Sequence, residues 1–179
     1  IDLFWDNQPK FPDSNSFIHD QKYAGESAID KIKKIQKILI NESIDFYLLN
    51  SLDSIAWLTN LRGNDIDYTP LIFCNVIIPK KGKIELFVNL EKIKSNLEYL
   101  THFSKINDFN NLEKFIKNID LKSSIGFDEQ ETSFYYKDVC NNFNLKTVNL
   151  QNPCLYLKAI KNQTELKGAK KANKRDGVS

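Results

Sequence analysis

Apolar residues recur along this chain with two periods, one typical of helices and one typical of strands. Over residues 22–42 they lie three to four residues apart, which predicts an amphipathic helix. The apolar positions are Ile29, Ile32, Ile35, Ile38 and Leu39. The lysines between them, which we expect to face solvent, are Lys31, Lys33, Lys34 and Lys37. A basic amphipathic helix can also lie on a membrane surface, but such helices usually add Trp or Phe to the apolar face, so a helix packed on the core is favoured.

Short apolar runs between the helical patterns predict strands. These are Ile44–Leu49, Leu71–Ile78, Lys83–Val88, Phe103–Ile106, Ser123–Phe127 and Leu145–Val148. Residues 79–82 are typical of a hairpin turn between two of them. Helices are predicted to begin at Asn50 or Ser51 and to cover residues 90–100, 110–118 and 133–143. Strands that alternate with helices, with one hairpin among them, indicate an α/β fold with a central mixed β-sheet flanked by helices.

The two ends of the chain carry weaker patterns. Residues 1–21 have no period, and their aromatic residues predict an extended segment that lies on a surface. Those aromatics are Phe4, Trp5, Phe11 and Phe17. Near the other end, Asn162 and Glu165 predict a capped helix, whose thin apolar stripe is Leu166, Ala169 and Ala172. We expect both ends to belong to something larger, and residues 162–179 to be the least stable part.

Composition limits the possible classes of protein. A chain of 179 residues that is 41% hydrophobic can bury one core. Its 25 basic and 23 acidic residues nearly cancel, so they produce no strong positive potential that would attract nucleic acid. Cys74, Cys140 and Cys154 are too widely spaced for a zinc site or a disulfide framework, which favours a reducing compartment. No apolar run approaches the roughly 20 residues that span a bilayer, and no signal-peptide pattern is present. We predict a cytoplasmic domain without a nucleic-acid or membrane partner.

Residue types that carry hydrolytic or redox chemistry are sparse. The six glycines are scattered and His19 and His102 are isolated, so neither a phosphate loop nor a His-based metal site is predicted. Asp65 and Asp67 are typical of turn chemistry. One further acidic group is interpreted as a solvated loop and helix start: Asp128, Glu129 and Glu131. We therefore predict no catalytic and no metal-binding residue in this chain.

The most informative segment is residues 51–70, SLDSIAWLTNLRGNDIDYTP. It predicts an apolar helix followed by a loop rich in groups that make directed contacts. The candidate site residues are Trp57, Asn60, Arg62, Asp65 and Tyr68. Arg62 is one of two arginines in a chain that otherwise uses lysine, so a planar donor for a carboxylate is indicated. Whether it contacts another domain or only pairs locally with Asp65 or Asp67 stays open.

This segment, with LIFCNVII after it, resembles Xaa-Pro aminopeptidases of the creatinase/prolidase superfamily. Their pattern is S-L-D-x-I-A-W-L-x-N-L/I-R-G-x-D-I-x-Y-x-P. The start, IDLFWDNQPKFP, is similar to the family's D-L-x-W-x-x-R-P-x-x-P linker, and the end, NPCLYLKAIKNQTELKGAKKANKRDGVS, to its crossing into the catalytic domain. Gln8 stands where the family has a basic residue, and Asp67 where Pro or another residue is common.

The resemblance implies a creatinase-like domain over residues 22–150, preceded by an interdomain linker at residues 1–21. Residues 151–179 would lead into a pita-bread catalytic domain that this chain does not include. It implies a parent enzyme that releases the N-terminal residue from peptides with proline second. Two divalent metal ions, typically manganese, would be held there by two Asp, a His and two Glu.

In that parent, the five candidate site residues would shape the active-site entrance or contact the catalytic domain, and a second subunit is a possible partner. The alternative is a partner-binding module of a pita-bread protein that has lost its metals, similar to the large subunit of a histone chaperone.

Overall fold

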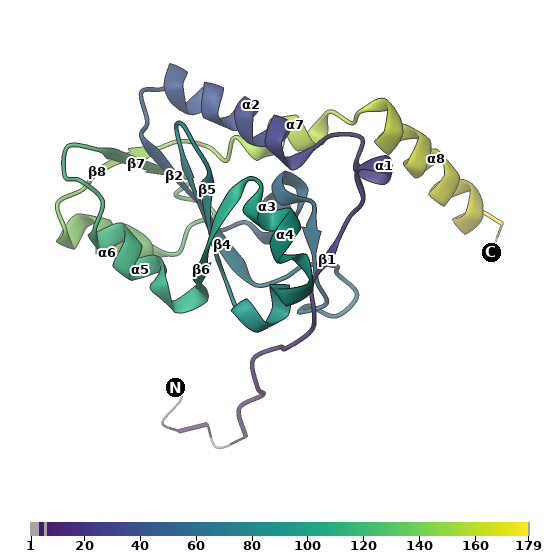
Figure 1. Cartoon of the computed structure of the whole chain (residues 1–179), viewed down its shortest axis with the longest axis horizontal. Helices are drawn as coiled ribbons and strands as arrows, with labels where there is room; N and C mark the ends of the chain where they lie inside the picture. Colours follow the sequence, from purple (N-terminus) through teal and green to yellow (C-terminus); the bar gives the residue numbers. More distant parts are fainter. Residues whose placement is uncertain (1–3, 6, 179) are drawn as a thin grey trace.

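A six-stranded mixed sheet forms the centre of the computed structural model, which describes residues 4, 5 and 7–178 (Figure 1). Its order is β6-β5-β4-β2-β7-β8. The strands are β2 (Phe46–Leu49), β4 (Cys74–Pro79), β5 (Ile84–Val88), β6 (Ser104–Asp108), β7 (Ser124–Phe127) and β8 (Lys146–Asn149). Within this sheet β4 runs against its neighbours β2 and β5, and the other pairs are parallel. The predicted α/β fold with a mixed sheet is confirmed.

Both faces of the sheet are buried, because successive side chains of a strand enter different core clusters. Tyr47 and Leu49 pack in one cluster and Leu48 in the other. The first cluster is covered by α2 (Ala28–Asn41), α3 (Leu52–Thr59), α4 (Leu97–Thr101) and α7 (Cys154–Ala159). The second is covered by α5 (Leu112–Lys117) and α6 (Phe134–Asn142), which lie together on one side in Figure 1. The domain therefore has three layers, with helices on each face of the sheet.

The prediction of one helix over residues 22–42 is wrong in two respects. It is divided into α1 (Gln21–Ala24) and α2, because Gly25 adopts a left-handed conformation with φ 74°. A Cβ at Gly25 would also lie 2.4 Å from Oδ1 of Asn162, so any larger residue there would displace the side chain that caps the last helix. Lys31, predicted to face solvent, is 2% exposed and points into the domain.

Other boundaries differ from the prediction for local reasons. The strand predicted from Leu71 begins at Cys74, because residues 71–73 instead bond to the preceding loop through the carbonyl of Leu71 and the amide of Phe73. Residues 90–100 are helical as predicted, but they begin as the 3₁₀-helix η1 (Leu90–Asn96). A second short 3₁₀-helix, η2 (Phe109–Asn111), precedes α5, and the helix α7 was not predicted.

The segment before α1 is extended and lies against the domain. Its strand β1 (Phe17–Ile18) pairs antiparallel with β3 (Leu61–Arg62). The Phe11 ring lies 5.2 Å from the Phe73 ring between centroids, as the prediction of surface packing requires. Phe4, in contrast, is 89% exposed. Residues 1–3 and 6 of the predicted linker lie outside the described part of the chain.

The last helix, α8 (Gln163–Asp176), has the predicted capping box formed by Asn162 and Glu165. It contains no buried residue and extends away from the sheet past α1 (Figure 1). Its start is held by Asn162, whose Nδ2 donates to the carbonyl of Ala24 at 2.8 Å. The expectation that residues 162–179 are the least stable part stays a prediction.

Candidate functional site

The candidate segment Ser51–Pro70 folds as the helix α3, the short strand β3 and a loop. Ser51 is the N-cap residue of the helix, and Asn60 is its C-cap residue, in a left-handed conformation with φ 56°. The turn at Asn60 reverses the chain, so that β3 can pair with β1. Gly63 then allows the chain to pass close to Ile72, since a Cβ there would lie 2.9 Å from the Cβ of Ile72.

Asn60 and Trp57 hold α3 against α2. Asn60 is 2% exposed, and its Oδ1 accepts a hydrogen bond from Nζ of Lys31 at 2.7 Å. Its Nδ2 donates to the carbonyl of Glu26 at 3.1 Å. Nζ of Lys31 also donates to the carbonyl of Trp57 at 2.6 Å and lies 4.9 Å from the centre of its ring. These two candidate residues therefore act inside the domain in this structure.

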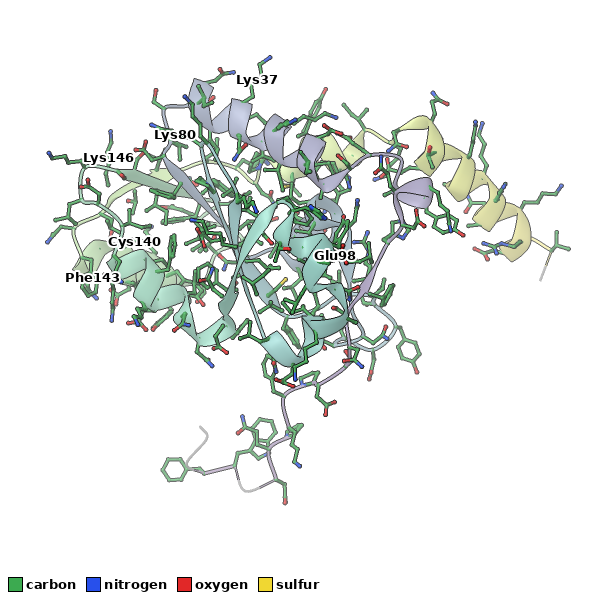
Figure 2. The ribbon with its side chains drawn as sticks, viewed as in Figure 1. Lys37, Lys80, Glu98, Cys140, Phe143 and Lys146 are labelled. Carbon is green, nitrogen blue, oxygen red and sulfur yellow. The ribbon has the colours of Figure 1, made fainter. Side chains whose placement is uncertain are left out.

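Lys31 is a buried amine whose hydrogen bonds go to neutral acceptors. Burial lowers the pKa of Lys31 to about 8, the nearby charge of Arg62 acts in the same direction, and Glu26 opposes both. Other lysines of the chain are exposed: the side chains of Lys37, Lys80 and Lys146 project from the surface (Figure 2).

Arg62 contacts backbone carbonyls rather than a carboxylate. Its Nη1 donates to the carbonyls of Ala56 and Leu61, the latter at 3.0 Å. The side chain is half-buried, and burial lowers the pKa of Arg62 from its ordinary value. Within the described residues Nε and Nη2 of Arg62 donate no hydrogen bond, so part of the guanidinium fork has unused donors.

Asp65 forms a buried ion pair with Lys92, so the local pairing with Arg62 that the sequence left open is not formed by Asp65. Its Oδ2 lies 2.7 Å from Nζ of Lys92, with the two side chains 0% and 1% exposed. Oδ2 also accepts from the amide of Phe73 at 2.8 Å, and Oδ1 accepts from Oγ of Ser14 at 2.8 Å. We call Asp65, Lys92, Ser14 and the Phe73 amide the Asp65 cluster.

Tyr68 lies at the tip of the loop and is the one candidate whose side chain is fully exposed. The tip is a turn, in which the amide of Thr69 donates to the carbonyl of Ile66 at 3.1 Å. Tyr68 has φ 62°, a conformation that bulky side chains rarely adopt. The structure thus separates the five candidates into buried anchors (Asn60, Asp65), half-buried residues (Trp57, Arg62) and one displayed ring.

Sequence reasoning missed Lys31, Lys92 and Ser14. Lys31 occupies a core position of α2, three residues after Ala28 and four before Ile35, so its spacing was a usable signal. Lys92 and Ser14 have no such signal, because their partner Asp65 is distant in sequence.

The acidic group predicted to be solvated is partly buried. Asp128 is 6% exposed, and its carboxylate accepts from the amides of Gln130 and Asn152, each at 2.9 Å. Asn152 in turn donates to Oγ of Ser54 at 2.9 Å and to Oε2 of Glu131 at 2.7 Å. These bonds fasten the segment before α7 to α3, so the interpretation of Asp128 as solvated was wrong.

The described residues contain no group of three or more His, Cys, Asp or Glu side chains placed to hold a metal ion. The cysteines are also poorly suited as nucleophiles, since burial raises the pKa of Cys74 and Cys154 to about 12 and that of Cys140 to about 11. A dinuclear metal centre does not fit the residues of this part of the chain. No helix in the described part is long and apolar enough to cross a membrane.

This chain belongs to the creatinase/prolidase N-terminal domain family, whose sequence model matches residues 7–165. It is 31% identical over 173 residues to Xaa-Pro aminopeptidase 1 of Dictyostelium discoideum. That alignment covers 96% of this chain and 27% of the relative, so the chain spans less than a third of that protein's length.

Solved structures show the same fold. The chain is similar to the X-prolyl aminopeptidase of Caenorhabditis elegans, described as a cytosolic enzyme with a di-nuclear active site. The TM-score is 0.82 at 23% identity, covering 93% of this chain and 28% of that one. It is also similar to an Xaa-Pro dipeptidase from Bacillus anthracis, with a TM-score of 0.59 at 18% identity, covering 79% of this chain and 38% of that one.

Replacing Lys92 with methionine should strongly destabilise the 179-residue chain. The carboxylate of Asp65 would stay buried without its charged partner, which typically costs about 3–5 kcal/mol of unfolding free energy. Urea unfolding measures this. Lys94→Met is the matched control, because Lys94 pairs with Glu91 on the surface, where the two side chains are 65% and 73% exposed, and a loss of less than about 1 kcal/mol is expected there. A similar small loss for Lys92→Met would contradict the role given to this ion pair.

Lys31 should make stability depend on pH in the alkaline range. Its folded pKa of about 8 is below the ordinary 10.5, so between these values the unfolded chain binds more protons and stability rises with pH. Relative to Lys31→Met, the wild type should gain up to about 3 kcal/mol across this window. Urea unfolding at pH 7, 9 and 10 measures it, with Lys37→Met as the exposed control on the same helix. A difference that does not change with pH would show that Lys31 keeps an ordinary pKa.

Proposed function

We propose that this chain is the non-catalytic domain of a cytosolic metallo-aminopeptidase that releases the N-terminal residue from Xaa-Pro peptides. The observation that carries the proposal is similarity to an Xaa-Pro aminopeptidase over 96% of the chain, at 31% identity. The loop motif RGNDIDYTP at residues 62–70 supports it, because it belongs to the segment that resembles these peptidases. The peptidase names of the relatives favour this function over the partner-binding alternative.

In this proposal the residues that catalyse peptide hydrolysis lie outside this chain. The relative from D. discoideum is more than three times as long as the matched part, which leaves room for a catalytic domain. The metal ions, which we propose to be manganese, would be held there, since the described residues offer no ligand set. Residues 1–21 and 151–179 would connect the domain over residues 22–150 to its neighbours in the parent.

The domain's own part would be to shape the active-site entrance so that only short proline-containing peptides enter, and to support assembly with the catalytic domain and a second subunit. Two features support this role. Tyr68 is fully exposed on a loop whose base is fixed by buried contacts. Arg62 keeps unused donors that suit a carboxylate on the catalytic domain or at a peptide C-terminus.

A peptidase assay tests the proposal. The natural protein that contains this chain, supplied with Mn²⁺, should release the first residue of a peptide with proline second. The 179-residue chain alone should show no turnover, because its described residues offer no set of metal ligands. A peptide with alanine second is the substrate control. Turnover that follows the isolated chain through purification would contradict the proposal, as would an inactive natural protein.

Arg62→Lys should separate a role between domains from a purely local one. In the natural protein we expect kcat/KM for an Xaa-Pro peptide to fall about tenfold, because lysine cannot make a bidentate contact and a misplaced entrance is costly in rate. In the 179-residue chain the unfolding free energy should fall by at most about 1 kcal/mol, because a lysine can still donate to one of the carbonyls that Arg62 contacts. A chain that melts several degrees lower while the natural protein keeps its kinetics would show that Arg62 is only structural.

A further inference from the structure

The tip of the loop combines two unusual properties in one residue. Tyr68 is fully exposed, yet it holds a left-handed backbone conformation with φ 62°. An exposed position is free to use glycine or asparagine for such a turn, which would remove the strain. A bulky ring kept in this conformation therefore points to a function for the ring itself.

Strain at an exposed tip persists only if the base of the loop is fixed. The amide of Asp65 donates to the carbonyl of Leu71 at 3.0 Å, which closes the loop at its two ends. The carboxylate of Asp65 then accepts from the amide of Phe73 at 2.8 Å and pairs with Lys92 at 2.7 Å. The ion pair is fully buried, so the base of the loop cannot shift without exposing or separating two charges.

The N-terminal segment supplies the last contacts of this base. Oγ of Ser14 donates to Oδ1 of Asp65 at 2.8 Å and accepts from the amide of Asn64 at 3.2 Å. One hydroxyl thus joins the carboxylate of Asp65 to the backbone of the residue before it. The Phe11 ring also covers the amine of Lys92, with Nζ 5.4 Å from the ring centre.

We propose that Ser14 and Lys92 are positioning residues of the proposed peptidase, and that they act through Asp65 to fix the exposed ring of Tyr68 where it touches the peptide substrate. The inference rests on the proposed function. The N-terminal segment would then set the geometry of the active-site entrance and not only connect domains.

A double-mutant cycle in the natural protein tests this inference, because it separates positioning from general stability. Ser14→Ala removes both hydroxyl contacts and should lower kcat/KM for an Xaa-Pro peptide about fivefold, while Ser14→Thr restores it to within about twofold. Ser104→Ala is the matched control: its buried hydroxyl donates to the carbonyl of Leu100 at 2.7 Å and has no contact with the loop or with Lys92, so a change within about twofold is expected. In a Tyr68→Ala background, Ser14→Ala should have no further effect.

The outcomes are distinguishable. Ser14→Ala and Ser104→Ala losing equal activity would overturn the inference, as would a Ser14→Ala effect that persists without the Tyr68 ring. Wild-type kinetics in Ser14→Ala beside a clear loss in Tyr68→Ala would overturn the positioning role and leave the proposed function standing. If Tyr68→Ala has no effect on an active natural protein, the Tyr68 ring does not contact the substrate and the inference is overturned. An inactive natural protein would overturn the proposed function and, with it, this inference.

Discussion

The buried ion pair between Asp65 and Lys92 is the interaction on which the arrangement of this domain's loop depends. It joins segments that are far apart in the chain: the loop after β3, the start of η1 and, through Ser14, the N-terminal segment. The partners are 0% and 1% exposed, so neither charge can be satisfied by water if the other is lost. A buried ion pair contributes little net stability over an apolar pair, but an arrangement that separates the two partners is strongly disfavoured, because it leaves a buried charge unpaired.

Lys31 plays a comparable part at the C-terminal end of α3, before the loop. Its amine bonds to Asn60 and to the carbonyl of Trp57, where α3 ends. The last turn of a helix leaves carbonyls without partners, and a cation is favoured there by the helix dipole. Two buried lysines therefore fix the segment that runs from α3 to the loop tip. Lys31 donates to Trp57 and Asn60 at the end of α3, and Lys92 pairs with Asp65 at the base of the loop.

The rest of the fold supports this segment without adding chemistry. The sheet is covered by helices on both faces, and its strands β4 and β5 are almost wholly buried. The described residues provide no metal site, while the loop tip and α8 present exposed surface. Such a distribution suits a domain that positions a surface for a neighbour, which is the role we propose for it beside a catalytic domain.

The sequence by itself determined the class of fold and most of the strands and helices, though not α7 or the division between α1 and α2, because hydrophobic periods of 2 and 3.6 residues depend on local burial. It also identified the segment at residues 51–70 and its family resemblance. It could not assign roles within the segment: Asn60 and Asp65 were grouped with Tyr68, although the first two are buried and Tyr68 is fully exposed. Those roles were decided by Lys31, Lys92 and Ser14, which only the tertiary structure brings to the segment. The partners of a buried polar group are set by which distant elements pack together, and a local pattern carries no record of that packing.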